Sequence, residues 1–152
     1  MIEKRIIAQE ADMYFFRNRM EEEKAWCSDG MRYFLQFYDE NRSSLDFKKI
    51  LEVGCGTGYN LCFAGREYGL AGYGIDPSAE AVKYGNAKIK SMGLQIELKQ
   101  GFSDELPYEN DFFDIIYFGF CLYSIDRELL LQTLSEGNRV LKYGGGICSY
   151  GF

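Results

Sequence analysis

A cluster of glycines and one acidic residue are the parts of this sequence whose types and spacing suggest chemistry. Gly54, Gly56 and Gly58 follow a short apolar run and precede a segment with helical periodicity. This order predicts a strand that turns sharply into a helix, because glycine adopts backbone angles closed to other residues and lets a ligand approach the main chain. The first amide groups of that helix would face the ligand.

An aspartate ends the next predicted strand. Asp76 falls 22 residues after Gly54, a spacing at which a second-strand carboxylate can accept hydrogen bonds from a ribose diol. The alternative is that Asp76 caps the helix that starts near Ser78, and the two roles are compatible. The glycine pattern is G-x-G-x-G and lacks the G-x-G-x-x-G of a dinucleotide site, which disfavours an NAD-dependent dehydrogenase.

The segments around these residues alternate between strand and helix patterns. We predict strands at 49–53, 71–75, 95–99, 112–119 and 147–150. Helices are predicted at 60–68, 78–90 and 127–141, with one or two more in 1–26 and another at 31–38. Strands separated by helices of this length pair in parallel through right-handed crossovers. The predicted fold class is therefore α/β, with a doubly wound, mostly parallel sheet in three α/β/α layers.

Composition narrows the possible functions. The chain has 152 residues and a formal net charge of −6, so we expect no general affinity for nucleic acid, whose phosphates are bound largely by Lys and Arg. The absence of His excludes Ser-His and Cys-His nucleophiles and most catalytic zinc sites. Five Cys without a C-x-x-C pair argue for reduced thiols and against a metal site. No signal peptide or membrane-spanning segment is evident, so we expect a cytoplasmic protein.

Several motifs occur together in a fixed order. EVGCGTG spans 52–58, IDPS spans 75–78, and RVLKYGG spans 139–145. Together they resemble the class I S-adenosylmethionine-dependent methyltransferases over about residues 49–150. The resemblance implies a Rossmann-like sheet, S-adenosyl-L-methionine as the cofactor, and methyl transfer to a small-molecule acceptor. It implies a single methyltransferase domain over 1–152, with a helical cap at 1–44 and a cofactor-binding core at 45–152. It identifies neither the acceptor nor a catalytic residue.

The resemblance also implies which residues meet the cofactor. They lie in or directly beside four loops, 54–58, 76–78, 101–105 and 119–124, and are Glu52, Gly54, Cys55, Gly56, Asn60, Asp76, Pro77, Phe102, Ser103, Phe118, Gly119 and Tyr123. The glycine turn would hold the amino acid end of the cofactor, and Asp76 would take the ribose hydroxyls with Pro77 beside the adenine. Phe102 stands where the family has an Asp, so the adenine would meet the Ser103 amide and stack on Phe102. Tyr123 would contact the methionine moiety or the substrate, unless it is an aromatic core residue.

Two alternatives stay open at this point. A regulatory module that binds S-adenosylmethionine without catalysis would carry the same motifs. In the family, a helix and an antiparallel hairpin usually follow the fifth strand, whereas this sequence ends at Phe152 and lacks that hairpin. We therefore expect the outer edge of the strand at 147–150 to be covered by the N-terminal helices or by a second copy in a homodimer, or the chain to be a fragment of a longer protein.

Overall fold

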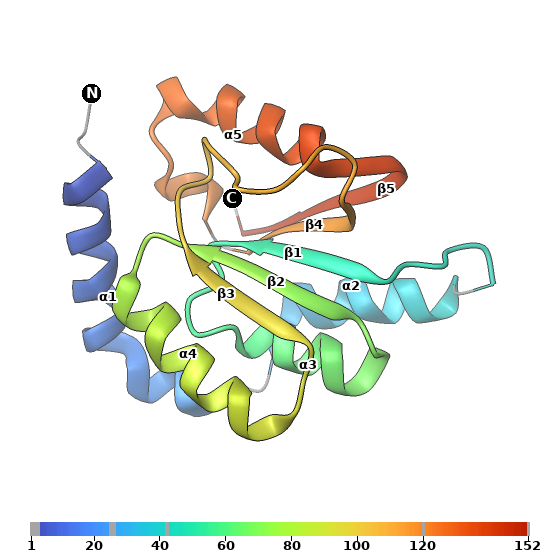
Figure 1. Cartoon of the computed structure of the whole chain (residues 1–152), viewed down its shortest axis with the longest axis horizontal. Helices are drawn as coiled ribbons and strands as arrows, with labels where there is room; N and C mark the ends of the chain where they lie inside the picture. Colours follow the sequence, from blue (N-terminus) through green and yellow to red (C-terminus); the bar gives the residue numbers. More distant parts are fainter. Residues whose placement is uncertain (1–3, 25–26, 42, 120, 152) are drawn as a thin grey trace.

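The computed structural model describes residues 4–24, 27–41, 43–119 and 121–151. Its centre is a sheet of five parallel strands in the order β3-β2-β1-β4-β5 (Figure 1). The strands are β1 (Lys49–Val53), β2 (Ala71–Asp76), β3 (Ile96–Gln100), β4 (Phe113–Gly119) and β5 (Leu141–Tyr150). The predicted α/β class and the doubly wound parallel sheet are confirmed.

The strand order reverses at β1, which pairs with β2 on one side and with β4 on the other. These central strands are covered on both faces, and their residues are correspondingly apolar: Ile115, Ile116 and Tyr117 of β4 are fully buried. The chain leaves β1 toward β2 and later returns to the opposite side of β1. The loops that follow β1 and β4 therefore diverge at the carboxyl ends of the strands, where open α/β sheets bind ligands.

Helices cover both faces of the sheet (Figure 1). On one face lie α2 (Asp29–Glu40), α3 (Tyr59–Tyr68) and α4 (Ala79–Met92), and on the other lies α5 (Arg127–Val140). The long helix α1 (Lys4–Lys24) stands beside the start of α4, at the end of the sheet where the strands finish. The segment predicted to hold one or two helices before residue 27 is thus one helix over its described part.

The segment between β3 and β4 contains no helix and is held by α5. Ser103 Oγ lies 2.9 Å from Thr133 Oγ1, and the Leu106 amide donates to Glu136 Oε2 at 2.8 Å. The Arg139 guanidinium donates to the Leu106 carbonyl oxygen at 2.9 Å and pairs with Glu136. Polar groups of the loop thus form hydrogen bonds with side chains of α5. In a helix, the same kind of groups would be satisfied by backbone hydrogen bonds within the segment.

β5 begins earlier than the predicted strand at 147–150. Leu141 pairs with Phe113, and the register then shifts so that Ile115 pairs with Gly146. The extra residues include Gly144, whose φ of +81° lies in the left-handed region that favours glycine. The glycine run is therefore a bulge within a strand that starts directly after α5, and not a turn between helix and strand.

The outer edge of β5 pairs with no other strand in the described part of the chain. Ile147 is 47% exposed, whereas every residue of β4 before Gly119 is buried. α2 meets one face at the end of this strand, since a Cβ atom on Gly30 would lie 2.1 Å from Tyr150 Cγ. An N-terminal helix thus contacts β5, and cover of its outer edge by a second copy stays a prediction.

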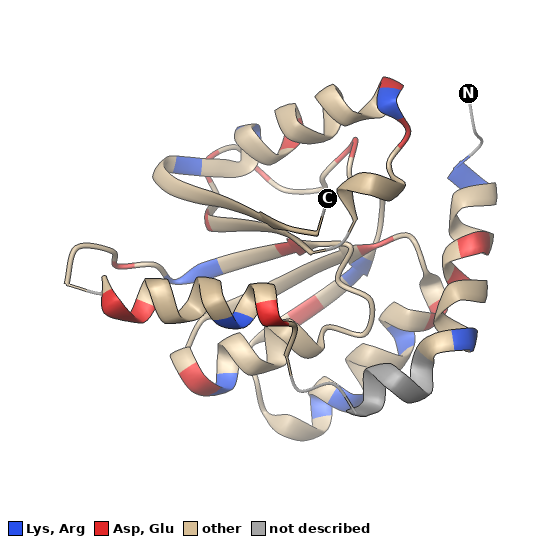
Figure 2. Cartoon of the chain, turned by 180° about the vertical axis from the view of Figure 1, so that it is seen from behind, with Lys and Arg blue, Asp and Glu red and all other residues tan. Residues whose placement is uncertain are grey.

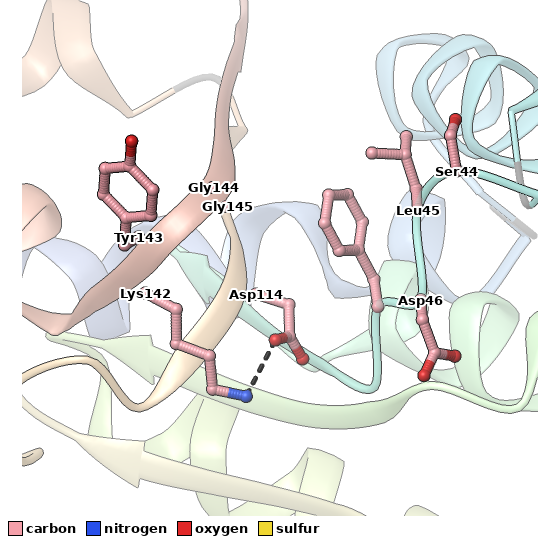
Figure 3. Close-up of a pocket in the computed structure, with 9 residues that line it drawn as sticks. Ser44, Leu45, Asp46, Asp114, Lys142, Tyr143, Gly144 and Gly145 are labelled. Carbon is pink, nitrogen blue, oxygen red and sulfur yellow. Dashed lines mark hydrogen bonds and ion pairs between the residues drawn. The ribbon is translucent and has the colours of Figure 1, made fainter.

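A polar cavity of about 220 Å³ lies at the opposite end of the sheet, where β1 and β4 begin (Figure 3). Here Asp114 Oδ2 accepts the amide hydrogens of Lys48 and Lys49, each at 2.8 Å, and its Oδ1 accepts from Lys142 Nζ at 2.8 Å. Burial would raise the pKa of the Asp114 carboxyl, but these hydrogen bonds outweigh burial and lower the pKa. The carboxylate joins the starts of β1, β4 and β5, far from the end where the strands finish.

We predict that Asp114→Asn lowers the free energy of unfolding at neutral pH by about 1.5–3 kcal/mol, because a charged acceptor is lost. Since the folded pKa is lowered, this stabilisation is present above the ordinary value of 3.8 and is lost as the pH falls through the folded value. Denaturant unfolding at pH 7 and at steps below pH 4 should show the difference from wild type shrink. Asp46→Asn, at an exposed carboxylate paired with Lys48, should change stability by less than about 0.5 kcal/mol. Equal losses in the two variants would contradict the role of Asp114.

Candidate functional site

The glycine turn after β1 is anchored to the end of β2. The amides of Gly54 and Cys55 both donate to the Ile75 carbonyl oxygen, at 2.8 and 3.1 Å. Gly54 has a φ of +77°, and a Cβ atom there would lie 2.7 Å from Cys121 Cβ. Glycine alone satisfies both constraints, so the chain can turn from β1 into α3 while the loop after β4 lies against it.

Asp76, the last residue of β2, binds the same turn. Its Oδ2 accepts the Gly56 amide hydrogen and its Oδ1 accepts the Ser78 amide hydrogen, both at 2.8 Å, and the residue is 9% exposed. Burial raises the pKa of the Asp76 carboxyl, the two backbone bonds lower it, and the nearby charge of Asp12 raises it, with a net increase. Ser78 supplies the side-chain cap of α4. The Asp76 carboxylate therefore organises the turn and keeps acceptor capacity for a ligand hydroxyl.

Glu52 and Asn60 form a buried polar link behind the turn. Asn60 Nδ2 donates to Glu52 Oε1 at 2.6 Å, and Asn60 Oδ1 accepts the Ser28 amide hydrogen at 2.8 Å. Both side chains are buried. These hydrogen bonds join β1, α3 and the start of α2. The Asn60 side chain therefore holds together the elements around the turn.

The loop after β3 places Phe102 and Ser103 between α1 and α5. Lys4 Nζ of α1 lies 5.1 Å from the centre of the Phe102 ring and 3.1 Å from Asp104 Oδ2. A cation at that distance covers one face of the ring. The Asp104 carboxylate turns toward α1 and the Ser103 hydroxyl toward α5. The Ser103 hydroxyl and the Asp104 carboxylate are thus engaged by the neighbouring helices, and contact of the Ser103 amide and the Phe102 ring with an adenine stays a prediction.

The loop after β4 offers backbone groups and one exposed ring. Phe118 is buried against α5, and a Cβ atom on Gly119 would lie 2.7 Å from the Tyr117 ring. Phe118 and Gly119 can therefore meet a ligand only through their backbone. Tyr123, in the short 3₁₀ helix Leu122–Ser124, is 66% exposed, so its ring is available to a ligand and is not part of the core.

Two further candidate residues, Cys55 and Pro77, contact the neighbouring strands β2 and β3. Cys55 is buried, and its Sγ would lie 2.5 Å from a Cβ atom on Gly74, so its side chain packs on β2. The Pro77 carbonyl oxygen accepts from Gln100 Nε2 at 3.1 Å, which ties the turn after β2 to the end of β3. All the candidate residues thus lie at or next to the carboxyl ends of β1 to β4. Within the described ranges, no cluster of acidic and Cys side chains suits a metal ion.

The structure adds two residues of α1 that sequence analysis did not single out. Asp12 Oδ1 accepts from Ser78 Oγ at 2.6 Å, and Lys4 pairs with the loop after β3. Both lie on the inward stripe of α1, together with the buried Phe15. The signal that would have found them is a charged residue on an otherwise mostly apolar helical stripe.

Among the helices that the structure describes, none is long and apolar enough to cross a membrane.

Comparison with known proteins identifies the family. Residues 50–145 match the family model described as a methyltransferase domain. The chain belongs to this methyltransferase family. The resemblance to class I S-adenosylmethionine-dependent methyltransferases is thereby confirmed.

Curated relatives of this methyltransferase domain are longer than the chain. A demethylmenaquinone methyltransferase of Bacillus mycoides (strain KBAB4) is 36% identical over 128 residues, which cover 82% of this chain and 49% of the relative. The protein of the same name from Bacillus subtilis (strain 168) is 36% identical over 102 residues, which cover 65% of this chain and 43% of the relative. The chain thus spans about half the length of the curated relatives it matches.

Solved structures share the fold of this methyltransferase domain. The crystal structure of MccD protein superposes with a TM-score of 0.71 at 23% identity, covering 82% of this chain and 55% of that chain. Geranyl diphosphate C-methyltransferase from Streptomyces coelicolor A3(2), solved with Mg²⁺, geranyl diphosphate and S-adenosyl-L-homocysteine, superposes with a TM-score of 0.64 at 20% identity. That match covers 75% of this chain and 42% of that chain.

We predict that Gly54→Ala destabilises the domain more than Gly69→Ala. Both glycines are left-handed, with φ of +77° and +70°, so a Cβ atom costs about 1–2 kcal/mol of unfolding free energy at either position. At Gly69 that atom meets nothing within 4 Å, whereas at Gly54 it meets Cys121. Denaturant unfolding should show an additional loss at Gly54 only, and Cys121→Gly should recover part of it. Equal losses at both positions would rule out the close packing.

Proposed function

We propose that this domain binds S-adenosyl-L-methionine at the carboxyl end of its sheet and serves methyl transfer to a small-molecule acceptor. The observation that carries the proposal is the meeting of the glycine turn with Asp76 where the strand order reverses. The hydrogen bond from the Gly56 amide to Asp76 keeps the backbone of the glycine turn next to the Asp76 carboxylate, so one ligand could contact both. Family membership and the names of the curated relatives support the same function.

The residues at this end fit the parts of the cofactor. Backbone groups from 54–58 suit its amino acid end, because no side chain can intervene at Gly54. The Asp76 carboxylate suits a ribose diol, since hydrogen bonds to an ionised acceptor are the stronger ones. Phe102 and the Ser103 amide suit the adenine. The ring of Tyr123 is exposed, which supports contact with the methionine moiety or the acceptor.

Alignment is what this chain contributes to the reaction. The cofactor supplies a methyl group that is already activated on a sulfonium, so the protein needs no nucleophile of its own. Orienting two reactants is worth up to about 7–11 kcal/mol of the barrier. The turn that Ile75 and Asp76 hold provides a fixed frame for that orientation. The absence of His is compatible with this chemistry, and no residue is assigned a catalytic role.

Calorimetry with S-adenosylhomocysteine and with NAD tests the binding step. We expect roughly micromolar affinity for S-adenosylhomocysteine, about −8 kcal/mol, and none for NAD. Asp76→Asn should weaken the binding of S-adenosylhomocysteine by about 1.5–3 kcal/mol, because the charged acceptor of the ribose diol is lost. Asp46→Asn, at the opposite end of the sheet, is the matched control. Binding of NAD alone would overturn the proposal, and unchanged affinity in Asp76→Asn would remove Asp76 from the ribose site.

Turnover separates an enzyme from a regulatory module that binds the cofactor without catalysis. The first acceptor to test is demethylmenaquinone, which the names of the curated relatives specify. An enzyme converts S-adenosylmethionine to S-adenosylhomocysteine in the presence of its acceptor, whereas a regulatory module binds S-adenosylmethionine and yields no product. Because the chain spans about half of those relatives, a panel of other small acceptors belongs in the same assay.

We also propose that the outer edge of β5 pairs with a second copy. The strand carries one charged side chain, Lys142, which is bonded to Asp114, so charge does not protect the edge from pairing. Exposed Ile147 adds apolar surface. Ile147→Lys should convert dimer to monomer in light scattering, whereas Met92→Lys, at an exposed site on α4, should not. A wild-type monomer at high concentration would count against this pairing.

A further inference from the structure

α1 crosses the carboxyl end of the sheet and is tied to two loops of the proposed site (Figures 1 and 2). Near its start, Lys4 pairs with Asp104 at 3.1 Å, in the loop after β3. Two turns later, Asp12 accepts from the hydroxyl of Ser78, directly after β2. The helix therefore spans the loop assigned to the adenine and the loop assigned to the ribose.

Asp12 stands at the end of a chain of hydrogen bonds that leads to Asp76. Ser78 Oγ donates to Asp12 Oδ1 at 2.6 Å and accepts the Ala81 amide hydrogen at 3.0 Å. The Ser78 amide donates to Asp76 Oδ1 at 2.8 Å. Ser78 is fully buried, so these three bonds determine where both its main chain and its side chain lie. Any displacement of Ser78 moves a donor that orients the Asp76 carboxylate.

We propose that Asp12 is a positioning residue for the ribose of the cofactor. Its carboxylate fixes the Ser78 hydroxyl and accepts the Glu80 amide hydrogen at 3.1 Å, which sets the first turn of α4. Ser78 then sets the direction of the Asp76 carboxylate. The inference rests on the proposed function and extends the ribose site to a residue of α1.

The effect of Asp12 is geometric, because its charge acts in the opposite direction. After burial, the charge of Asp12 contributes to the raised pKa of Asp76, which disfavours the ionised form that accepts best from a diol. An uncharged side chain of the same shape, with an oxygen in the same place, preserves the positioning and removes that cost. The substitution Asp12→Asn meets this description.

Other contacts keep α1 docked when Asp12 is lost. The Phe15 ring is buried and lies 5.7 Å from the Tyr84 ring of α4. Lys4 pairs with both Asp104 and Glu105. The loss of Asp12 therefore acts on the turn after β2 and not on the attachment of the helix.

Calorimetry of the full chain with S-adenosylhomocysteine measures the effect. Asp12→Ala should raise Kd about tenfold, which is less than the loss of a whole charge-assisted bond, because a displaced Asp76 carboxylate keeps part of its bonding to the ribose. Asp12→Asn should bind as well as wild type or better. Glu10→Ala removes an exposed acid from the same helix and should leave Kd unchanged. An Asp12→Asn variant as weak as Asp12→Ala would overturn the geometric role.

A ligand without ribose hydroxyls separates positioning from a general loosening of the fold. With a 2′,3′-dideoxy analogue of S-adenosylhomocysteine, wild type and Asp12→Ala should bind equally. Loss of the same factor for both ligands would overturn the proposal. If Asp12→Ala does not fold, Ser78→Ala is tested with the same two ligands. It removes the hydroxyl contact to Asp12 together with the side-chain cap of α4, so only the difference between the two ligands is compared. A wild-type chain that does not bind S-adenosylhomocysteine refutes the proposed function instead, so the two failures are distinguishable.

Discussion

The last two residues of β2 hold the end of β1 in place. The Ile75 carbonyl oxygen accepts the amide hydrogens of Gly54 and Cys55, and the Asp76 carboxylate accepts that of Gly56. The turn that leaves β1 is therefore bound to the neighbouring strand, and its position follows from the register of the β1–β2 pair. Everything that packs on this turn, including Cys121 after β4, depends on that register.

Burial of the Asp76 carboxylate is tolerated because backbone donors meet it. Asp76 has two amide donors, yet desolvation still raises its pKa. A ligand that brings hydroxyl donors would complete the solvation that burial has removed. The acceptor is already oriented before any ligand arrives, so little of the interaction energy would go into ordering it. The Asp114 carboxylate at the other end of the sheet differs, since a lysine and two amides already lower its pKa.

The central strands could be predicted because their signals are local. The apolar run of β4 and the glycines after β1 need no knowledge of distant residues. The start of β5 could not be predicted, because the pairing of Leu141 with Phe113 decides it, while the local glycine run resembles a turn. The spacing correctly placed Asp76 at the end of a strand beside the glycine turn, and the four predicted loops do meet at one end of the sheet, whereas their contacts with a cofactor stay a prediction. Asp12 was not singled out. Its place on a mostly apolar helical stripe marks it as a candidate, but nothing near it in the sequence tells which loop α1 will meet.

The loop after β3 contains neither a helix nor one of the five strands, and one isolated bridge joins Phe102 to Glu105. Thr133, Glu136 and Arg139, at successive intervals of three residues on α5, supply its partners. Opening of α5 would remove these partners together, and the loop would be released in the same event. The helix and the irregular segment thus form one cooperative unit with a shared opening free energy. The protected amide protons of both segments should therefore report the same opening free energy in hydrogen exchange, although only one of the two segments is a helix.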